Sequence, residues 1–349
     1  MKGIKFVVSI IFSVFLLNCG TKLKLGEGSI ITPIDTYELP SRGFFMGILP
    51  TPGEGQDFSQ SYYQASLYAE FSPVWGKPTP FYDLAEDLSG EWGDVFVTGY
   101  IRGNGMFPLI HMNFYEGDAE NLVLVKPPGL EDATLSDSEW RHSYLSSALA
   151  ILYAVRPLYF SLGNEVNRWY ELYGTGENPN GFQYFVSLYR EIYDTLKSIS
   201  PETKVLCTFA REIVTENREA DLTVLEYFNG YLDILVFTTY PFSVQGILSP
   251  SDIPDEYFLR AFDHIGSMPI GFSELSWIVH ESFGGEKGQA DFLRYMVGRL
   301  TIDQGIDLKL LGWAWLHDLP GGDSTGLITY SGKEREAYTV WKEIYTSSH

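Results

Sequence analysis

Eight short apolar runs, separated by longer amphipathic segments, dominate the chain from Gly43 onward. Runs of this length, often bounded by Pro or Gly, are typical of buried parallel strands. Repeated βα units of this kind predict a parallel sheet, and eight of them fit one closed (β/α)8 barrel of the TIM type. The predicted strands are Phe44–Leu49, Glu70–Trp75, Met106–Phe114, Pro157–Gly163, Lys204–Phe209, Leu232–Tyr240, Pro269–Ser273 and Leu308–Trp315.

Helical spacing marks the segments between these strands. Apolar residues from Phe182 to Leu196 follow the 3,4 pattern of a single buried stripe. Ser136 and Glu139 have the spacing of a capping box ahead of a helix that runs to about Val155. The last two units are expected to close with helices over residues 286–300 and 333–345.

The N-terminus has the pattern of an export signal. Lys2 and Lys5 precede the apolar run Phe6–Leu17, which is too short to cross a bilayer comfortably. The following Leu16-Leu17-Asn18-Cys19 resembles the cleavage site of a bacterial lipoprotein. We therefore expect a signal peptide over residues 1–18, a lipidated Cys19 with a flexible tether over residues 19–42, and a catalytic domain over residues 43–349. This implies a protein anchored in the bacterial cell envelope, or a secreted one if Cys19 carries no lipid.

Composition excludes several classes of partner and cofactor. The net charge of −21 disfavours nucleic acid, because phosphate binding needs clustered Lys and Arg. The six histidines form neither His-x-His nor His-Glu-x-x-His, and no phosphate-binding glycine loop occurs, so no metal and no cofactor are expected. With Cys19 lipidated, Cys207 is left without a disulfide partner and is expected to be inert core. The membrane is expected as a partner only through the lipid, and the chain is expected to be a monomer.

Two of the predicted strands end on a glutamate. The fourth runs into Gly163-Asn164-Glu165, and the seventh runs into Ser273-Glu274 three βα units later. Strands four and seven of an eight-stranded barrel lie across its mouth from each other, at the end where barrel enzymes hold their chemistry. Glycoside hydrolysis requires two carboxyls facing one small volume, one to protonate the leaving oxygen and one to attack or stabilise the sugar cation. The pair is a more specific signal than either glutamate alone, which would also suit an ordinary solvated strand end.

On these residues the sequence resembles clan A of the glycoside hydrolases, which are retaining enzymes on a TIM barrel. The resemblance extends as a pattern from Gly43 to the C-terminus and is specific near Gly163-Asn164-Glu165 and Glu274. It implies that Glu165 is the general acid/base and Glu274 the nucleophile, in a double displacement on a β-linked poly- or oligosaccharide. Asn164 would bind the sugar 2-hydroxyl.

Further positions extend the resemblance. Tyr240, in Thr239-Tyr240-Pro241 after strand six, would contact the nucleophile, and Trp315 after strand eight would form the floor of the sugar subsite. His111, near the end of strand three, lies where the clan often places a polar residue or a histidine to bind sugar hydroxyls. The Asn-Glu and Tyr-Pro pattern is similar to that of endo-β-1,4-galactanases, but Glu274 is followed by Leu-Ser-Trp, so neither a family nor a sugar is assigned.

The aromatic residues can also be interpreted from their chemistry, without the family resemblance. Tyr and Trp prefer sites that are partly wet and partly apolar, which suits sugar rings. Trp313, two residues deeper than Trp315, is expected to be core. Trp169 and Trp277 also follow strand ends and are candidates to line a cleft. Three charged residues after strands, whose roles stay open between substrate contact and a rim salt bridge, are Arg211, Glu212 and Asp318.

The competing hypothesis is a surface lipoprotein whose barrel only binds glycan or protein, since fold alone does not imply catalysis. The presence of both glutamates with Asn164 and Tyr240 beside them favours the enzyme. For a retaining enzyme we expect the two carboxyls about 5–5.5 Å apart. We also expect the higher pKa on Glu165, because two like charges in one site push their pKa values apart.

Overall fold

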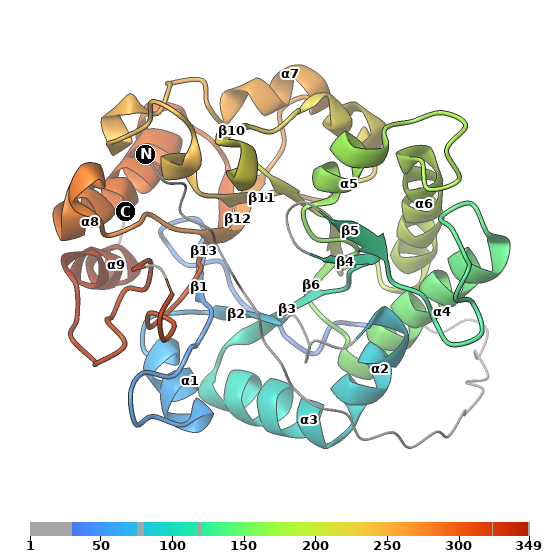
Figure 1. Ribbon diagram of the computed structural model, residues 1–349. Helices are drawn as coiled ribbons and strands as arrows, with labels where there is room; N and C mark the ends of the chain where they lie inside the picture. Colours follow the sequence, from blue (N-terminus) through green and yellow to red (C-terminus); the bar gives the residue numbers. More distant parts are fainter. Residues whose placement is uncertain (1–29, 75–79, 118–120, 323, 348–349) are drawn as a thin grey trace.

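The computed structural model describes residues 30–74, 80–117, 121–322 and 324–347, and it shows a parallel barrel surrounded by helices (Figure 1). The strand order is β7-β6-β3-β2-β1-β13-β12-β11-β8. Because β7 and β8 are consecutive parts of one strand path interrupted at Cys207, this order returns to its starting point, as in an eight-stranded TIM barrel. The strands are β1 Phe45–Ile48, β2 Phe71–Val74, β3 Phe107–His111, β6 Tyr159–Ser161, β7 Lys204–Leu206, β8 Thr208–Ala210, β11 Leu235–Thr239, β12 Ile270–Leu275 and β13 Leu308–Trp313. The prediction of an α/β barrel is confirmed; six of the eight predicted runs contain their strand, while β8 and β12 extend past the predicted ends at Phe209 and Ser273.

Two further pairs of short strands lie outside the barrel ladder. One is the antiparallel hairpin of β4 Tyr115–Gly117 and β5 Leu122–Leu124, within the long loop after strand three. The other pairs β9 Glu212–Ile213 with β10 Arg218–Glu219, in the loop after strand five. Both lie in loops that follow barrel strands, so they belong to the rim at the carboxyl ends.

The helices form the outer layer. The predicted stripe from Phe182 is confirmed by α6, and in the described part of the chain no helix is long and apolar enough to cross a membrane. The predicted capping box is wrong: α4 begins after Asp137, whose carboxylate accepts hydrogen bonds from the N–H and hydroxyl of Thr134 instead of capping the helix. The helices are α1 Phe58–Ser66, α2 Phe81–Ser89, α3 Glu91–Gly93, α4 Ser138–Val155, α5 Val166–Tyr173, α6 Phe182–Ile199, α7 Phe262–Ile265, α8 Gly285–Val297 and α9 Glu336–Thr346, with π-helical turns η1 Asp94–Ile101 and η9 Gly298–Asp303.

Alternation along the strands separates two apolar layers. On β11, Leu235 and Phe237 pack outward in the layer between strands and helices, while Val236 packs inside the barrel. The interior layer consists of Phe45, Phe71, Phe107, Leu109, Tyr159, Leu206, Ile234, Val236 and Leu310. The same alternation places the next inward residue of each strand above this layer, at the carboxyl end. On four strands that residue is polar, namely His111, Ser161, Thr208 and Thr238, whereas on β1, β2 and β13 it is Gly47, Pro73 and Gly312.

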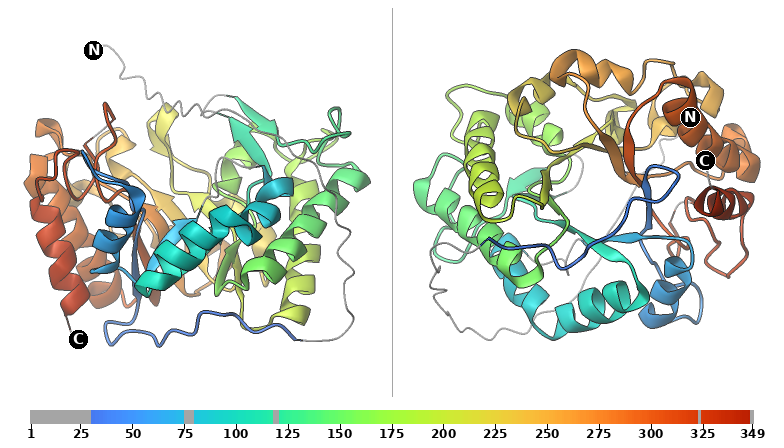
Figure 2. Two further views of the ribbon diagram at one scale, coloured as in Figure 1. Left: turned by 90° about the horizontal axis from the view of Figure 1, so that it is seen from below. Right: turned by 180° about the vertical axis from the view of Figure 1, so that it is seen from behind.

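Residues 30–42 belong to the folded domain. Asp35 forms a bidentate ion pair with Arg102, at 2.9 and 2.8 Å, and the Tyr37 hydroxyl donates to the Gly105 carbonyl at 2.8 Å. The Tyr37 ring packs on Phe107 of the interior layer. The segment runs beneath the barrel, opposite the β4–β5 hairpin (Figure 2, left). The expected flexible tether is therefore not seen over residues 30–42, because buried contacts hold them; the predicted signal, Cys19 and the rest of the tether lie outside the described residues.

We predict that Tyr37→Ala lowers the free energy of unfolding by about 2 kcal/mol, since it removes a half-buried ring and its hydrogen bond from the lower end of the barrel. Leu39→Ala, at an exposed position of the same segment, should change it by less than about 0.5 kcal/mol. Chemical denaturation of both variants measures this. Equal stability of Tyr37→Ala and the parent would mean that the segment is a loose tether.

Candidate active site

Glu165 lies in a tight turn between β6 and α5. Its φ and ψ of 48° and 44° are in the left-handed region, which is uncommon for a residue other than glycine and is found more often at functional sites. The Glu165 N–H donates to the Thr208 hydroxyl at 2.8 Å. The Tyr115 hydroxyl contacts the carbonyl oxygens of Asn164 and Glu165, at 2.8 and 3.1 Å. Two neighbouring elements, β8 and the β4–β5 hairpin, thus hold the turn.

Two side chains hold the Glu165 carboxylate. The Thr238 hydroxyl donates to its Oε1 at 2.7 Å from the end of β11, and Arg168 pairs with its Oε2 at 3.0 Å. Arg168 lies three residues along, on the first turn of α5, where i and i+3 side chains meet. Arg168 and Thr238 were not identified as site residues from the sequence. The Glu-x-x-Arg spacing was a visible signal for Arg168, whereas Thr238 is brought there only by the barrel.

Glu274 faces the interior because of an irregularity in β12. Ile270 and Phe272 pack outward, so regular alternation would also turn Glu274 outward, against the helices. The register shifts instead: Phe237 of β11 pairs with Phe272, and the next residue, Thr238, pairs with Glu274. Such a bulge re-aims a side chain, here toward the interior side that Thr238 occupies. Thr238 is therefore both the hydrogen-bond donor to Glu165 and the strand neighbour of Glu274.

The two glutamates interact electrostatically. Burial, and then the negative charge of Glu165, raise the pKa of the Glu274 carboxyl to about 8. We expected the raised pKa on Glu165, so the structure differs from the prediction. The physical reason is the unequal set of partners: Glu165 has a cation and a hydroxyl donor, while Glu274 makes no side-chain hydrogen bond or ion pair with the described residues. Glu274 therefore holds a proton through neutral pH in the unliganded protein.

Asn164 is oriented from the neighbouring strands. Its side-chain oxygen accepts a hydrogen bond from the Thr208 hydroxyl at 2.6 Å, and its backbone N–H is 3.3 Å from the side-chain oxygen of Asn113. The same Thr208 hydroxyl receives the Glu165 N–H. One threonine on β8 thus fixes both residues of the Asn-Glu motif. Thr208 was not identified from the sequence, because nothing in its own strand marks it.

The aromatic and histidine candidates lie around the same end of the barrel. Tyr240 directly follows β11 and is half-buried, but the structure shows no hydrogen bond from its hydroxyl to Glu274 among the described residues. Trp315 is half-exposed and belongs to neither apolar layer. It follows Ala314, whose N–H donates to the Leu275 carbonyl beside Glu274, at 3.0 Å. His111 ends β3 on the inward side, and burial lowers its pKa to about 3, so it is neutral at physiological pH.

Other candidates are structural. Trp313 is core as expected, and its indole N–H donates to the Thr325 carbonyl at 3.0 Å. Trp169 and Trp277 are also fully buried, so neither lines a cleft. Arg211 pairs with Glu219 at 2.6 Å and Asp318 pairs with Arg335 at 2.6 Å; Arg211, Asp318 and Arg335 are buried. These ion pairs brace the loops rather than reach toward a ligand.

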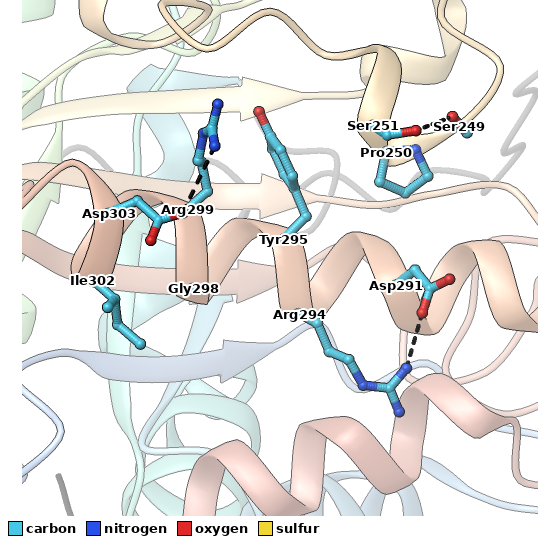
Figure 3. Close-up of a pocket in the computed structure, with 10 residues that line it drawn as sticks. All are labelled: Ser249, Pro250, Ser251, Asp291, Arg294, Tyr295, Gly298, Arg299, Ile302 and Asp303. Carbon is cyan, nitrogen blue, oxygen red and sulfur yellow. Dashed lines mark hydrogen bonds and ion pairs between the residues drawn. The ribbon is translucent and has the colours of Figure 1, made fainter.

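A groove of about 510 Å³ lies elsewhere, on the outer face of the barrel (Figure 3). It is lined by α8, η9 and the short turn η6 Pro250–Asp252. Its charges neutralise one another, with Arg294 3.0 Å from Asp291 and Arg299 3.7 Å from Asp303. Among the described residues no group of three or more His, Cys, Asp or Glu side chains could hold a metal ion. The glutamate pair is thus the site with convergent chemistry.

Comparisons with known proteins identify the fold. The sequence matches no protein-family model and no curated protein. The structure is similar to xylanase 10B from Thermotoga maritima, with a TM-score of 0.58 and 11% identity over 87% of this chain and 95% of that one. A family 39 glycoside hydrolase from Bacteroides cellulosilyticus WH2 has a TM-score of 0.57 and 16% identity, covering 88% and 65%. A β-glucuronidase from Bifidobacterium dentium has a TM-score of 0.55 and 13% identity, covering 87% and 46%.

The chain thus spans less than half the length of that β-glucuronidase and nearly the whole length of the xylanase. At these identities the likeness shows the fold, and the three neighbours are glycoside hydrolases. The expected resemblance to the barrel of clan A glycoside hydrolases is confirmed at that level.

The pKa of Glu274 makes a prediction about stability. The folded protein keeps a proton on Glu274 that the unfolded chain releases above about pH 4.5, so the free energy of unfolding falls as the pH rises toward 8. Glu274→Gln removes this pH-dependent loss of stability. The melting temperature of the variant, relative to the parent, should therefore increase steadily from pH 5 to pH 8, as measured by calorimetry in matched buffers. A constant difference across this range would mean that Glu274 is already ionised at pH 5.

Proposed function

We propose that the protein is a retaining glycoside hydrolase that cleaves a β-linked poly- or oligosaccharide by double displacement. The observation that carries this proposal is the convergence of Glu165 and Glu274: Thr238 donates to Glu165 and is the strand neighbour of Glu274, and the charge of Glu165 contributes to the raised pKa of Glu274. Two coupled carboxyls at the carboxyl ends of strands four and seven are what such a reaction needs. The β-glucuronidase neighbour supports a β-linked substrate.

In this mechanism Glu274 attacks the anomeric carbon while Glu165 donates a proton to the leaving oxygen. Glu165 then removes a proton from the water that releases the sugar from Glu274. In the free protein the proton is on Glu274, whereas this mechanism needs a proton on Glu165 and an ionised Glu274 when the bond breaks. Hydroxyl groups of a bound sugar would donate the hydrogen bonds that Glu274 lacks, and these favour its ionised form. Substrate binding would therefore prepare the nucleophile.

The other polar groups would position the sugar. Asn164, held by Thr208, would bind the 2-hydroxyl, and His111 would serve as a neutral partner for sugar hydroxyls. Trp315 and Tyr240 would offer amphipathic rings at the rim. The alternative remains a barrel that only binds glycan or protein, which would use the same rim without turnover.

Glu274→Gln should lower the rate of hydrolysis of aryl β-glycosides at least about 10³-fold, because the amide cannot attack the anomeric carbon. Oligosaccharide binding, measured by calorimetry, should persist because the shape of the site is retained. Asp291→Gln, at a paired position on the outer groove, is the control and should leave turnover unchanged. Unchanged turnover in Glu274→Gln would refute its role.

Trapping with a 2-deoxy-2-fluoro glycoside separates the possible roles. We expect the covalent label on the peptide that contains Glu274. A label on Glu165 would reverse the two roles, as the Arg168 ion pair at Glu165 would then suggest. Binding of sugar without label or hydrolysis would favour the non-catalytic alternative.

We also propose that the protein is exported and anchored through a lipid on Cys19. The signal-like residues 1–18 support this, and residues 30–42 run beneath the barrel, at the end opposite the β4–β5 hairpin. Cells fed radiolabelled palmitate should label the parent and Cys207→Ser equally and should fail to label Cys19→Ser. Label on Cys19→Ser would contradict the proposal.

A further inference from the structure

Glu212 is a buried carboxylate that the proposed mechanism does not use. It lies just after β8 and is 4% exposed. Its Oε1 accepts hydrogen bonds from the hydroxyls of Thr239 and Tyr257, each at 2.8 Å, and its Oε2 accepts the backbone N–H of Tyr240 at 2.6 Å. Glu212, at the start of β9, is thus a buried carboxylate that accepts three hydrogen bonds.

Two of these hydrogen bonds lie at the end of β11. Its ladder with β8 pairs Val236, Phe237 and Thr238 and goes no further. Beyond Thr238, the Tyr240 N–H has no strand carbonyl to bond, and a buried N–H without a partner is costly. The Glu212 carboxylate takes the place of the missing strand. Its side chain thereby provides hydrogen-bond partners for Thr239 and Tyr240, beyond the end of the ladder. Pro241 comes next, and its ring further restricts the backbone of Tyr240.

A charged network fixes Glu212 in turn. Its neighbour Arg211 is fully buried, donates to the Tyr257 carbonyl at 2.7 Å and stacks on the Tyr257 ring, 3.8 Å from its centroid. Glu219 on β10 neutralises Arg211 at 2.6 Å and also pairs with Arg260 at 3.0 Å. The titratable and charged groups around Glu212 are therefore Arg211, Glu219, Tyr240, Tyr257 and Arg260.

Two of the residues that Glu212 holds directly follow the residue that organises the glutamate pair. Thr239 and Tyr240 directly follow Thr238, which donates to Glu165 and is the strand neighbour of Glu274. The Arg211 N–H also bonds the Thr238 carbonyl at 2.9 Å. A shift of this strand end would move the donor to Glu165 and the ring of Tyr240 together.

We propose that Glu212 is a positioning residue of the active site, whose carboxylate substitutes for a strand partner and sets the place of Thr238 and Tyr240. This inference rests on the proposed function for its catalytic part, while its structural part can be tested without turnover. Burial raises the pKa of Glu212 to about 7, against the Arg211 charge and the hydrogen bonds from Tyr257 and Thr239. Glu212 is thus neutral below about pH 7 and ionised above it.

The structural part can be tested by NMR of protein labelled with ¹⁵N-tyrosine in the Glu274→Gln background, which removes the neighbouring ionisation. The amide proton of Tyr240 should lie downfield and titrate with a midpoint near pH 7. In the double variant Glu212→Gln/Glu274→Gln this titration should vanish while the other tyrosine amides keep their positions. A Tyr240 amide that titrates identically in both proteins, or in neither, would overturn the inference.

The catalytic part can be tested on the otherwise unaltered protein. Glu212→Ala should lower kcat/KM about 100-fold, mostly through kcat, because displacement of a positioning group by about 1 Å has an effect of this size. Glu212→Gln, which keeps an acceptor for the Tyr240 N–H, should recover to within about tenfold and lose any ionisation near pH 7 from its pH–rate profile. Glu216→Gln, exposed on the same loop, is the matched control and should behave as the parent.

If Glu212→Ala fails to fold, Glu212→Gln still decides the question through its pH profile. A Glu212→Gln profile that keeps an ionisation near pH 7 would overturn the catalytic part. If the parent hydrolyses no glycoside, the proposed function fails, and the Tyr240 titration still decides whether Glu212 holds the strand end.

Discussion

The structure depends on one constraint: two carboxyls turn into the same low-dielectric end of a barrel. Burial of Glu274 near Glu165 disfavours its charge, and its pKa rises to about 8. Ionisation of both carboxyls would cost stability, so the residues around the pair must hold it in place. Regular strand geometry would avoid this cost by turning Glu274 outward, beside Phe272. The register shift between β11 and β12 imposes it.

The surrounding residues hold the glutamate pair through a series of hydrogen bonds and ion pairs. Thr238 contacts one carboxyl and is the strand neighbour of the other, and Thr208 fixes the backbone and amide of the Asn-Glu motif. Glu212 holds the strand end that carries Thr238, from a loop braced by Arg211 and Glu219. Hydrogen bonds and ion pairs thus connect the loop after strand five with the glutamate pair at the mouth of the barrel. Such outer groups commonly decide how accurately the reacting groups are held.

Periodicity predicted the eight strands because each is a short apolar run, and the two glutamates because each ends such a run. It did not predict that Glu274 faces inward, since Ile270 and Phe272 set the opposite alternation. Thr208, Thr238 and Glu212 were not identified because their partners are distant in sequence and meet only when the barrel closes. The proton was expected on Glu165; Arg168, three residues away, explains the difference. Residues 30–42 were predicted to be a tether because their few apolar side chains lack periodicity.

The central claim is that Glu165 and Glu274 act as a retaining pair. The most direct measurement is proton NMR of the anomeric signals during the first minutes of hydrolysis of a β-glycoside. The account predicts that the β-anomer of the product forms first and then equilibrates, because two displacements at one carbon restore its configuration. First appearance of the α-anomer would show a single displacement by water and would contradict the account.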